Sequence, residues 1–371
     1  MDHNSCHRVR AAVIVGLGIL CGTIGVQRAF AEDATPAPAA TPAPPVGIDV
    51  TGFVDTYYAY KFNKTNDLYR NFDSVHNSFS LNLIEVALEK KPTNTLRVGF
   101  RTDLDYGPAA DTFSAADPSK GSGLVLEQAY VSYMPGKVQF DVGKFVTQHG
   151  AEVIETKDNW NYSRSLLFAL AIPYYHLGVR AIYNPSDKVS LGGYLVNGWN
   201  NSVDNNTGKT FGAMLTLKPN AKVSLVQNFM IGPEKNGTNS DPRSLADTVV
   251  TITPNGKLSL MANFDYGKEA SAKWWGVAGY VRYQIDKTWA VIPRIEYLDD
   301  SDAFMTGTAQ KLKEGTLTLE GKVGDALLAR AEFRRDFSDT AAFKDSKASP
   351  LKGQSGVTVG LVYSFGAKIV P

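Results

Sequence analysis

Apolar and polar positions alternate along residues 211–230 in two runs separated by a short polar joint. In the first run one face is apolar, with Phe211, Ala213, Leu215 and Leu217. After Pro219-Asn220 the same period resumes through Val223, Leu225 and Phe229. A period of two on both sides of a turn predicts a β-hairpin with one apolar and one wet face.

The same alternation recurs from Ile48 to the C-terminus, and the connections between runs fall into two lengths. Seven short connections combine Pro, Gly, Asn or Asp with lysine, which is turn chemistry: 90–94, 134–137, 184–188, 218–222, 253–257, 285–287 and 322–325. Eight longer polar segments lie between them: 63–77, 106–123, 146–174, 199–208, 232–244, 267–273, 299–315 and 338–355. These fifteen connections predict sixteen strands.

An even number of strands with short turns at one end and long loops at the other is typical of a bacterial outer-membrane barrel. In hydrocarbon every backbone amide needs a partner, and a sheet provides this only when it closes on itself. The predicted fold is therefore all-β, a transmembrane antiparallel up-and-down β-barrel whose apolar face meets lipid and whose polar face meets water. Two places break the alternation, at Glu85 and at Glu127-Gln128, and we expect β-bulges there. The alternative is a soluble periplasmic β-protein.

The N-terminus carries an export signal. Arg8 and Arg10 precede an apolar stretch over residues 11–26, and Ala29-Phe30-Ala31 provides a small-x-small cleavage site. Residues 1–31 are thus predicted to be a signal peptide; a membrane anchor is disfavoured because sixteen apolar residues are short for a bilayer. A lipoprotein would use Cys21, but bulky Leu20 precedes it. Residues 32–47 are rich in proline and alanine and predict a periplasmic linker, followed by the barrel over 48–371.

Cleavage would also change the composition. Both cysteines, Cys6 and Cys21, lie in the signal, so the mature chain could form no disulfide. The mature chain keeps 35 basic and 36 acidic residues, a net charge of −1. This balance excludes a strongly basic nucleic-acid binder.

Several segments together resemble the beta-barrel porin-2 family of Gram-negative outer membranes. They are GFVDTYYAY (52–60), EQAYVSY (127–133), DVGKFVTQHGAE (141–152), NYSRSLLFALAIPYYHLGVR (161–180) and NGWN (197–200) followed by DNN (204–206). The resemblance implies an outer-membrane channel, commonly a homotrimer, whose partners are outer-membrane lipid, lipopolysaccharide and small polar solutes. The chain departs from the usual barrel ending by the tail GAKIVP after Phe365.

The longest connection, 146–174, carries the apolar segment LLFALAI, which needs shelter. Ser163 or Ser165 could cap a short helix that Pro173 ends. The loops that narrow general porins suggest that this loop folds inward as a constriction loop; the alternative is packing on the outer rim or at a subunit interface. Its charged residues are Glu152, Glu155, Asp158 and Arg164.

The inward phase of the strands predicts a charged channel lining: Arg97, Arg101, Asp103, Asp105, Arg180, Arg282, Arg294, Glu296, Arg330, Glu332 and Arg334. Opposed charges at a constriction orient polar solutes and set ion preference. The excess of arginine predicts a modest anion preference. The alternative is that these residues form wall salt bridges that only keep the lumen wet.

The sequence contains few residues that could form a catalytic, cofactor or metal site. The mature chain offers His76, His149 and His176, far apart in sequence, and no Gly-x-Ser-x-Gly stretch, so we predict no catalytic, cofactor or metal site. The Asn and Asp residues of 200–206 could hold calcium, but a solvated loop tip is the simpler interpretation. The sequence favours a porin, a diffusion channel for ions and small polar solutes. The alternative is a plugged barrel acting as a hydrolase or adhesin.

Overall fold

The computed structural model of this chain describes residues 47–369, except 116 and 118–122. The predicted signal peptide, residues 1–31, and all of the predicted linker except Gly47 lie outside the described residues. The described part of the chain corresponds to the predicted barrel region.

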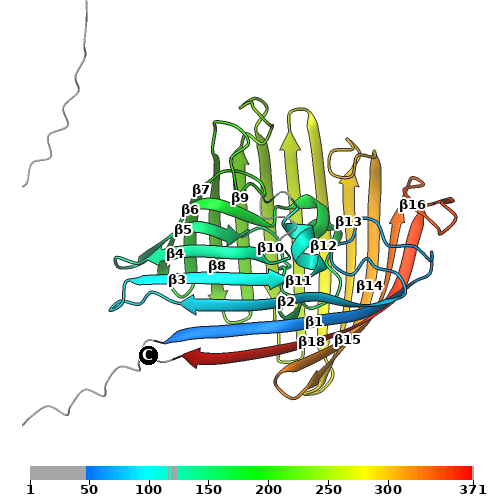
Figure 1. Ribbon diagram of the computed structural model, residues 1–371, viewed down its shortest axis with the longest axis horizontal. Helices are drawn as coiled ribbons and strands as arrows, with labels where there is room; N and C mark the ends of the chain where they lie inside the picture. Colours follow the sequence, from blue (N-terminus) through cyan, green and yellow to red (C-terminus); the bar gives the residue numbers. More distant parts are fainter. Residues whose placement is uncertain (1–46, 116, 118–122, 370–371) are drawn as a thin grey trace, which may run out of the picture. The chain divides into compact units, whose positions relative to one another are not determined.

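Sixteen antiparallel strands form one closed barrel, as the alternation predicted (Figure 1). They are β1 (Ile48–Lys61), β2 (Ser78–Lys90), β3 (Val98–Tyr106), β4 (Val125–Tyr133), β5 (Val138–Val146), β6 (Tyr175–Ser186), β7 (Val189–Val196), β8 (Thr210–Asn220), β9 (Val223–Gly232), β10 (Arg243–Ile252), β11 (Leu258–Glu269), β12 (Ala272–Gln284), β13 (Trp289–Asp300), β14 (Gln310–Val323), β15 (Leu327–Ser338) and β18 (Gly353–Ile369).

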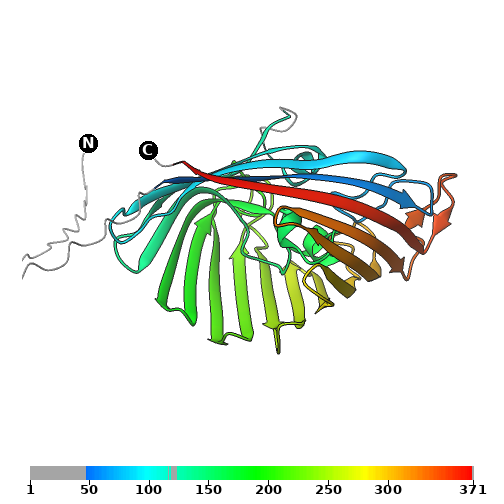
Figure 2. The ribbon, with the colours of Figure 1, turned by 90° about the horizontal axis from the view of Figure 1, so that it is seen from below.

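The barrel closes by pairing its first and last strands. β1 and β18 run side by side over the whole length of β1, from Ile48 opposite Ile369 to Lys61 opposite Gly356 (Figure 2). The tail after Phe365 therefore extends β18 as far as Ile369, still paired to β1. Closure pairs the two edges of the sheet with each other, which is the condition for crossing hydrocarbon.

The predicted turns and loops agree with the structure except in two places. The seven short connections and six of the eight long ones lie near their predicted positions. The loop expected at 299–315 is shorter than predicted, because β14 already begins at Gln310. The expected long loop at 267–273 is wrong, because β11 and β12 continue to Glu269 and Ala272 and are joined by only two residues. Here the strands are charged on both faces, so the period of two that marks a half-buried strand is lost although the backbone ladder continues.

The outer face of the strands is apolar, as expected for a surface in contact with lipid. In the β8–β9 hairpin Phe211 pairs with Ile231 and Leu217 with Leu225, which places all four side chains on one face. Half or more of the side-chain surface is exposed on outward residues of many strands, among them Val98, Val131, Val142, Leu195, Phe211 and Val359. The alternation of the sequence thus corresponds to lipid outside and lumen inside.

Both strands that were expected to be irregular contain a bulge, one at Glu127 as predicted and the other at Asn82, three residues before Glu85. The β1–β2 register shifts between Asp55 and Thr56, which leaves Asn82 without a partner in the ladder. The β3–β4 register shifts between Asp103 and Leu104, which leaves Glu127 without one. An extra residue reverses the phase of the strand beyond it, and this is why Glu85 and Glu127 seemed out of phase.

The remaining elements lie in the long loops. They are helix α1 (Pro108–Phe113), the 3₁₀ turn η1 (Thr156–Asp158), the π-helical turn η2 (Leu167–Ala171), and the short strands β16 (Phe343–Lys344) and β17 (Pro350–Leu351), which pair with each other. Among the described residues, no helix has the length and hydropathy needed to cross a membrane.

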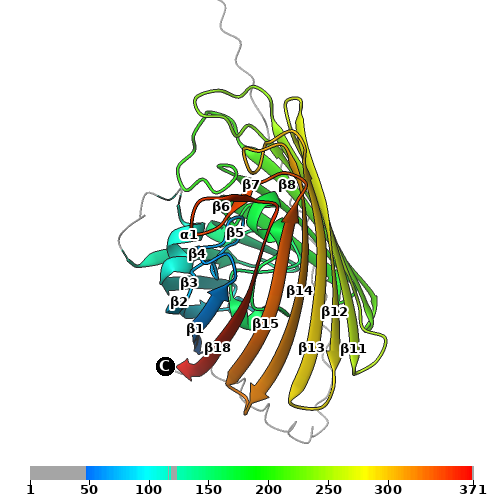
Figure 3. The same cartoon turned by 90° about the vertical axis from the view of Figure 1, so that its right-hand side faces the viewer.

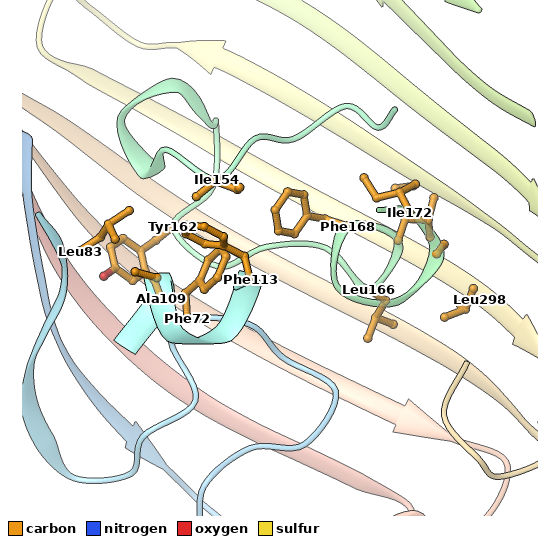
Figure 4. Close-up of a cluster of buried hydrophobic side chains, with 14 of the residues drawn as sticks. Phe72, Leu83, Ala109, Phe113, Ile154, Tyr162, Leu166, Phe168, Ile172 and Leu298 are labelled. Carbon is orange, nitrogen blue, oxygen red and sulfur yellow. The ribbon is translucent and has the colours of Figure 1, made fainter. Parts of the chain in front are cut away.

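Three long loops meet inside the barrel and form its apolar core (Figure 4). The loop 62–77 contributes Phe72, α1 contributes Ala109 and Phe113, and the loop 147–174 contributes a larger set: Ile154, Tyr162, Leu166, Leu167, Phe168, Ala171 and Ile172. The rings of Phe72 and Phe168 lie 6.0 Å apart in an edge-on arrangement. The barrel interior is therefore partly filled by loops that pack on one another.

Candidate functional site: the lumen and its constriction loop

The loop 147–174 folds into the barrel, and we call it the constriction loop. Its apolar segment is sheltered by the inner wall, as expected: Leu167 is fully buried, and η2 contacts β11 and β12. Gly276 of β12 makes room for it, since a Cβ at that position would lie 2.8 Å from Leu167 Cδ1. The Ser165 hydroxyl accepts a hydrogen bond from Phe168 N at 2.9 Å, which caps the turn as predicted.

Arg164 organises the constriction loop from within. Its guanidinium is buried and donates to the carbonyls of Val153 at 2.9 Å and Tyr162 at 2.7 Å, and to Thr156 Oγ1 at 2.9 Å. The same group lies 5.2 Å above the ring of Phe72. Burial lowers the pKa of Arg164, yet an arginine keeps its charge at any physiological pH.

Three wall arginines on β13 and β15 hold the constriction loop. These two strands lie on either side of β14 in one part of the wall (Figure 3). Arg294 donates to Glu152 Oε1 at 2.8 Å and to the carbonyl of Ser163 at 2.7 Å. Arg330 donates to the carbonyl of Thr156 at 2.7 Å, and Arg334 donates to the carbonyl of Arg164 at 2.5 Å. All three arginines are at most 2% exposed, so the loop covers them.

Wall carboxylates accept the amide protons of the same loop. Glu296 accepts from Leu166 N at 2.8 Å, at the start of η2, and Glu332 accepts from Tyr162 N at 2.9 Å. An anion near the positive end of a helical turn is favourable, and each bond satisfies a buried N–H group. The wall therefore binds the loop backbone through both its donors and its acceptors.

Asp55 of β1 also holds the middle of the loop, and it was not among the predicted site residues. It accepts hydrogen bonds from Thr156 Oγ1 at 2.6 Å, Tyr162 Oη at 2.8 Å and Asn82 Nδ2 at 2.6 Å. Gly360 of β18 gives the Tyr162 ring its space, because a Cβ there would lie 2.2 Å from the ring. The inward phase of Asp55 beside GFV could have identified it as a lumen residue.

The remaining predicted lining residues form pairs on other parts of the wall. Arg101 donates to Asp103 at 2.9 Å, Arg180 to Asp141 at 2.7 Å and Arg282 to Glu320 at 2.6 Å. These arginine side chains are 28%, 14% and 17% exposed, whereas their carboxylate partners are at most 3% exposed. In each pair the arginine side chain is the more exposed partner.

Four predicted residues lie elsewhere or have other partners. Arg97 is exposed and belongs to the turn before β3, outside the strand. Asp105 lies in a carboxylate cluster with Glu85 and Glu127. In the loop Asp158 pairs with Lys157, while Glu155 is 8% exposed, and burial raises its pKa.

A polar cavity of about 470 Å³ lies between the constriction loop and the short-turn end of the barrel. Lys157, Asp158 and Trp160 line it from the loop, and Arg282 and Lys322 from the wall. The turn that joins β14 to β15 also borders it, so it belongs to the end that faces the periplasm in an outer-membrane barrel.

The histidines act as structural hydrogen-bonding groups. His149 Nε2 lies 2.8 Å from Tyr194 Oη, His176 Nδ1 lies 3.0 Å from the carbonyl of Gly198, and His76 Nδ1 accepts from Lys61 N at 3.1 Å. Burial lowers the pKa of His149 to about 3, which keeps it neutral.

Solved structures share the fold at low identity. The outer-membrane channel DcaP of Acinetobacter baumannii has a TM-score of 0.57 at 15% identity, covering 86% of this chain and 97% of that one. An anion-selective porin from Comamonas acidovorans gives 0.56 at 12%, covering 86% and 99%. The trimer form of OmpT from Vibrio cholerae gives 0.57 at 12%, also covering 86% and 99%. No curated protein sequence matches the chain.

A family model described as "Putative beta-barrel porin-2, OmpL-like" matches residues 47–365, which spans the whole barrel up to the last aromatic residue. The closed sixteen-stranded barrel, the lipid-facing apolar surface and the loop folded into the lumen agree with this match. The chain belongs to the beta-barrel porin-2 family and is an outer-membrane porin.

Proposed function

We propose that this porin is a narrow, water-filled diffusion channel for ions and small polar solutes with a modest preference for anions. The observation that carries the preference is the geometry of the three wall pairs, in which the side chains of Arg101, Arg180 and Arg282 are partly exposed while their carboxylate partners are covered. A permeating ion in the lumen meets the positive side of each pair first. Among the structural neighbours, the porin from Comamonas acidovorans is described as anion-selective.

The preference is modest for two reasons. The charges of Arg294, Arg330 and Arg334 are neutralised by the constriction loop and the neighbouring wall carboxylates, so they contribute little to the field in the water. Salt also screens the exposed guanidiniums over about 8 to 10 Å near physiological ionic strength. The preference should therefore fade as the salt concentration rises.

The test is the zero-current potential of the refolded protein in a planar bilayer under a salt gradient. Replacing Arg101→Gln together with Arg282→Gln should shift the potential toward cation preference. The control is Arg97→Gln, which removes one positive charge from an exposed turn and should leave the potential unchanged. A wild type that clearly prefers cations, or a double variant with an unchanged potential, would overturn the proposed lining.

The barrel assembles as a homotrimer in this proposal, which rests on the trimer form of the similarly folded OmpT. Outer-membrane lipid and lipopolysaccharide would surround the trimer. Chemical cross-linking of the folded protein in detergent should give a trimer band; a monomer at all cross-linker concentrations would contradict it.

Family membership favours a non-enzymatic channel over the hydrolase or adhesin alternative.

We also propose that residues 1–31 are removed on export and that residues 32–47 form a periplasmic linker. N-terminal sequencing of the protein isolated from outer membranes should begin at Glu32. A chain that retains Arg8 and Arg10 would contradict the cleavage.

A further inference from the structure

Three carboxylates meet on neighbouring strands at the loop end of the barrel wall. They belong to Glu85 of β2, Asp105 of β3 and Glu127 of β4, and we call them the carboxylate triad. One oxygen from each lies within 4.8 Å of the others. Glu85 and Asp105 are direct partners in the β2–β3 ladder.

Two of the register shifts in the barrel wall lie beside this cluster. One bulge leaves Asn82 unpaired and sets the inward phase of Glu85, while the other has Glu127 itself as the extra residue. Bulges redirect side chains at the cost of ladder hydrogen bonds. The other two register shifts lie next to the β6–β7 and β8–β9 turns, on strands that carry no member of the triad.

Most of the triad oxygens have no hydrogen-bond partner among the described residues. Both carboxylate oxygens of Asp105 and of Glu127, and one of Glu85, are in this state, although the three residues are at most 2% exposed. Glu127 is fully buried and directs an unpartnered carboxylate into the cluster. Buried carboxylates elsewhere in this lumen, such as Asp55 and Glu332, accept several hydrogen bonds each.

The nearby cations are engaged with other residues. Lys144 donates to Asp117 at 2.7 Å, and Lys157 pairs with Asp158 at 2.5 Å. Within the described ranges, no ion pair involves a triad carboxylate. The carboxyl group of Glu155 in the constriction loop lies near all three and adds no positive charge. Buried charges in proteins are paired or coordinate a metal, and no side chain that the structure describes supplies the pairing here.

We propose that the carboxylate triad binds a divalent cation of the calcium type. Calcium takes six to eight oxygen ligands at about 2.3–2.6 Å in a flexible geometry, and carboxylates are its usual protein ligands. Magnesium loses its water reluctantly and is usually held by only one or two carboxylates. Three carboxylates whose oxygens lie within 4.8 Å of one another therefore suit calcium better, with water completing the coordination.

The ion would connect three strands and a loop. α1 packs against β2, β3 and β4, the strands that carry the triad. Neutralising the triad would remove the repulsion among its members and hold this part of the wall beneath α1. The site is separate from the wall arginines that hold the constriction loop, so its loss need not abolish conductance.

The test is calcium binding by the full-length mature protein, refolded from inclusion bodies in detergent without lipopolysaccharide, which binds divalent cations itself. Titration calorimetry with CaCl₂ at pH 7.5 should show one saturable site per chain, with weaker binding of MgCl₂. Glu127→Gln and Asp105→Asn should each lower calcium affinity at least ten-fold. Asp265→Asn is the matched control, because Asp265 is a fully buried inward carboxylate on β11, outside the triad.

A gel shift between boiled and unboiled samples verifies that each variant is folded, and Glu85→Gln provides a third variant if one fails. The proposal is overturned if the wild type shows no saturable calcium binding, which would mean that the triad carboxyls hold protons instead. It is also overturned if the folded triad variants bind calcium as tightly as the wild type. Conductance is measured in the presence of a chelator to test the channel function separately. A porin without calcium still conducts, so absent calcium binding with normal conductance overturns only the calcium site.

Discussion

Arg294 should be the residue on which the position of the constriction loop depends most. Its side chain is fully buried, and two of its partners, Glu152 and Ser163, belong to the loop. Arg294→Met keeps an apolar stem of similar length but leaves the carboxylates of Glu152, Glu296 and Glu314 without their shared cation. Removing one partner of a buried ion pair costs about 3–5 kcal/mol, because the other charge stays buried and uncompensated.

This cost falls on the loop more than on the barrel, because the loop can move away while the closed ladder of sixteen strands cannot. Each 1.4 kcal/mol changes an equilibrium tenfold. The opening equilibrium of residues 147–174 should therefore rise by about two to three and a half orders of magnitude. Hydrogen exchange measured by mass spectrometry would show this as faster exchange of loop peptides, with the peptides of β8 unchanged as the internal standard.

The matched control is Arg282→Met, which removes the same charge from the same wall. Arg282 donates to Glu320 and Gln284, both wall residues, so the loop should keep its protection. A double-mutant cycle with Glu152→Gln should give a coupling energy of about 0.5–3 kcal/mol. If the Arg294→Met loop exchanges as slowly as the wild type, the arginine does not hold the loop and the reasoning fails.

Three further outcomes are expected. The folded barrel should migrate differently on a gel before and after boiling, because a closed hydrogen-bonded sheet resists detergent; identical migration with a helical circular dichroism spectrum would contradict the fold. Deleting residues 157–170 should raise single-channel conductance in a folded barrel, and an unchanged conductance would mean that the loop does not limit the pore. Acidification should loosen the loop around His149, because the pKa of His149 is about 3 in the folded protein and about 6.5 in the unfolded chain. The contribution of neutral His149 to stability is therefore fully present above pH 6.5 and falls by about 1.4 kcal/mol per pH unit between pH 6.5 and pH 3. His149→Gln should remove this contribution, and an identical acid response in the variant would refute it.

The fold could be predicted because a barrel wall repeats one physical rule. Each strand must alternate between lipid and water, and each short turn needs residues that bend the chain, so local patterns such as residues 211–230 determine the strand count. The rule fails where both faces of a strand meet water. At Lys268 and Lys273 the alternation disappears although the ladder continues, and the sequence was therefore interpreted as a loop.

The inward fold of the constriction loop was predictable from one property, an apolar segment with nowhere else to be buried. The inward folding of Phe72 and Phe113 from two other loops was not, because a single aromatic residue in a polar loop gives no such signal. The roles of individual charges were also out of reach. The period of two places Arg101, Arg294 and Arg334 alike in the lumen, but only the packed loop distinguishes a covered guanidinium from one that faces water.

The same distinction explains how this lumen can be strongly charged and still weakly selective. Charges that hold the loop are buried in pairs and act over short distances, so they define the shape of the pore and not its field. The more exposed arginines, Arg101, Arg180 and Arg282, are each paired with a carboxylate, which neutralises most of the positive charge. Substitutions at these three positions should thus change ion selectivity. Substitutions at Arg294, Arg330 and Arg334 should instead change the rate of hydrogen exchange in the constriction loop. A variant that changes both properties by similar amounts would show that the two groups of arginines are not separate.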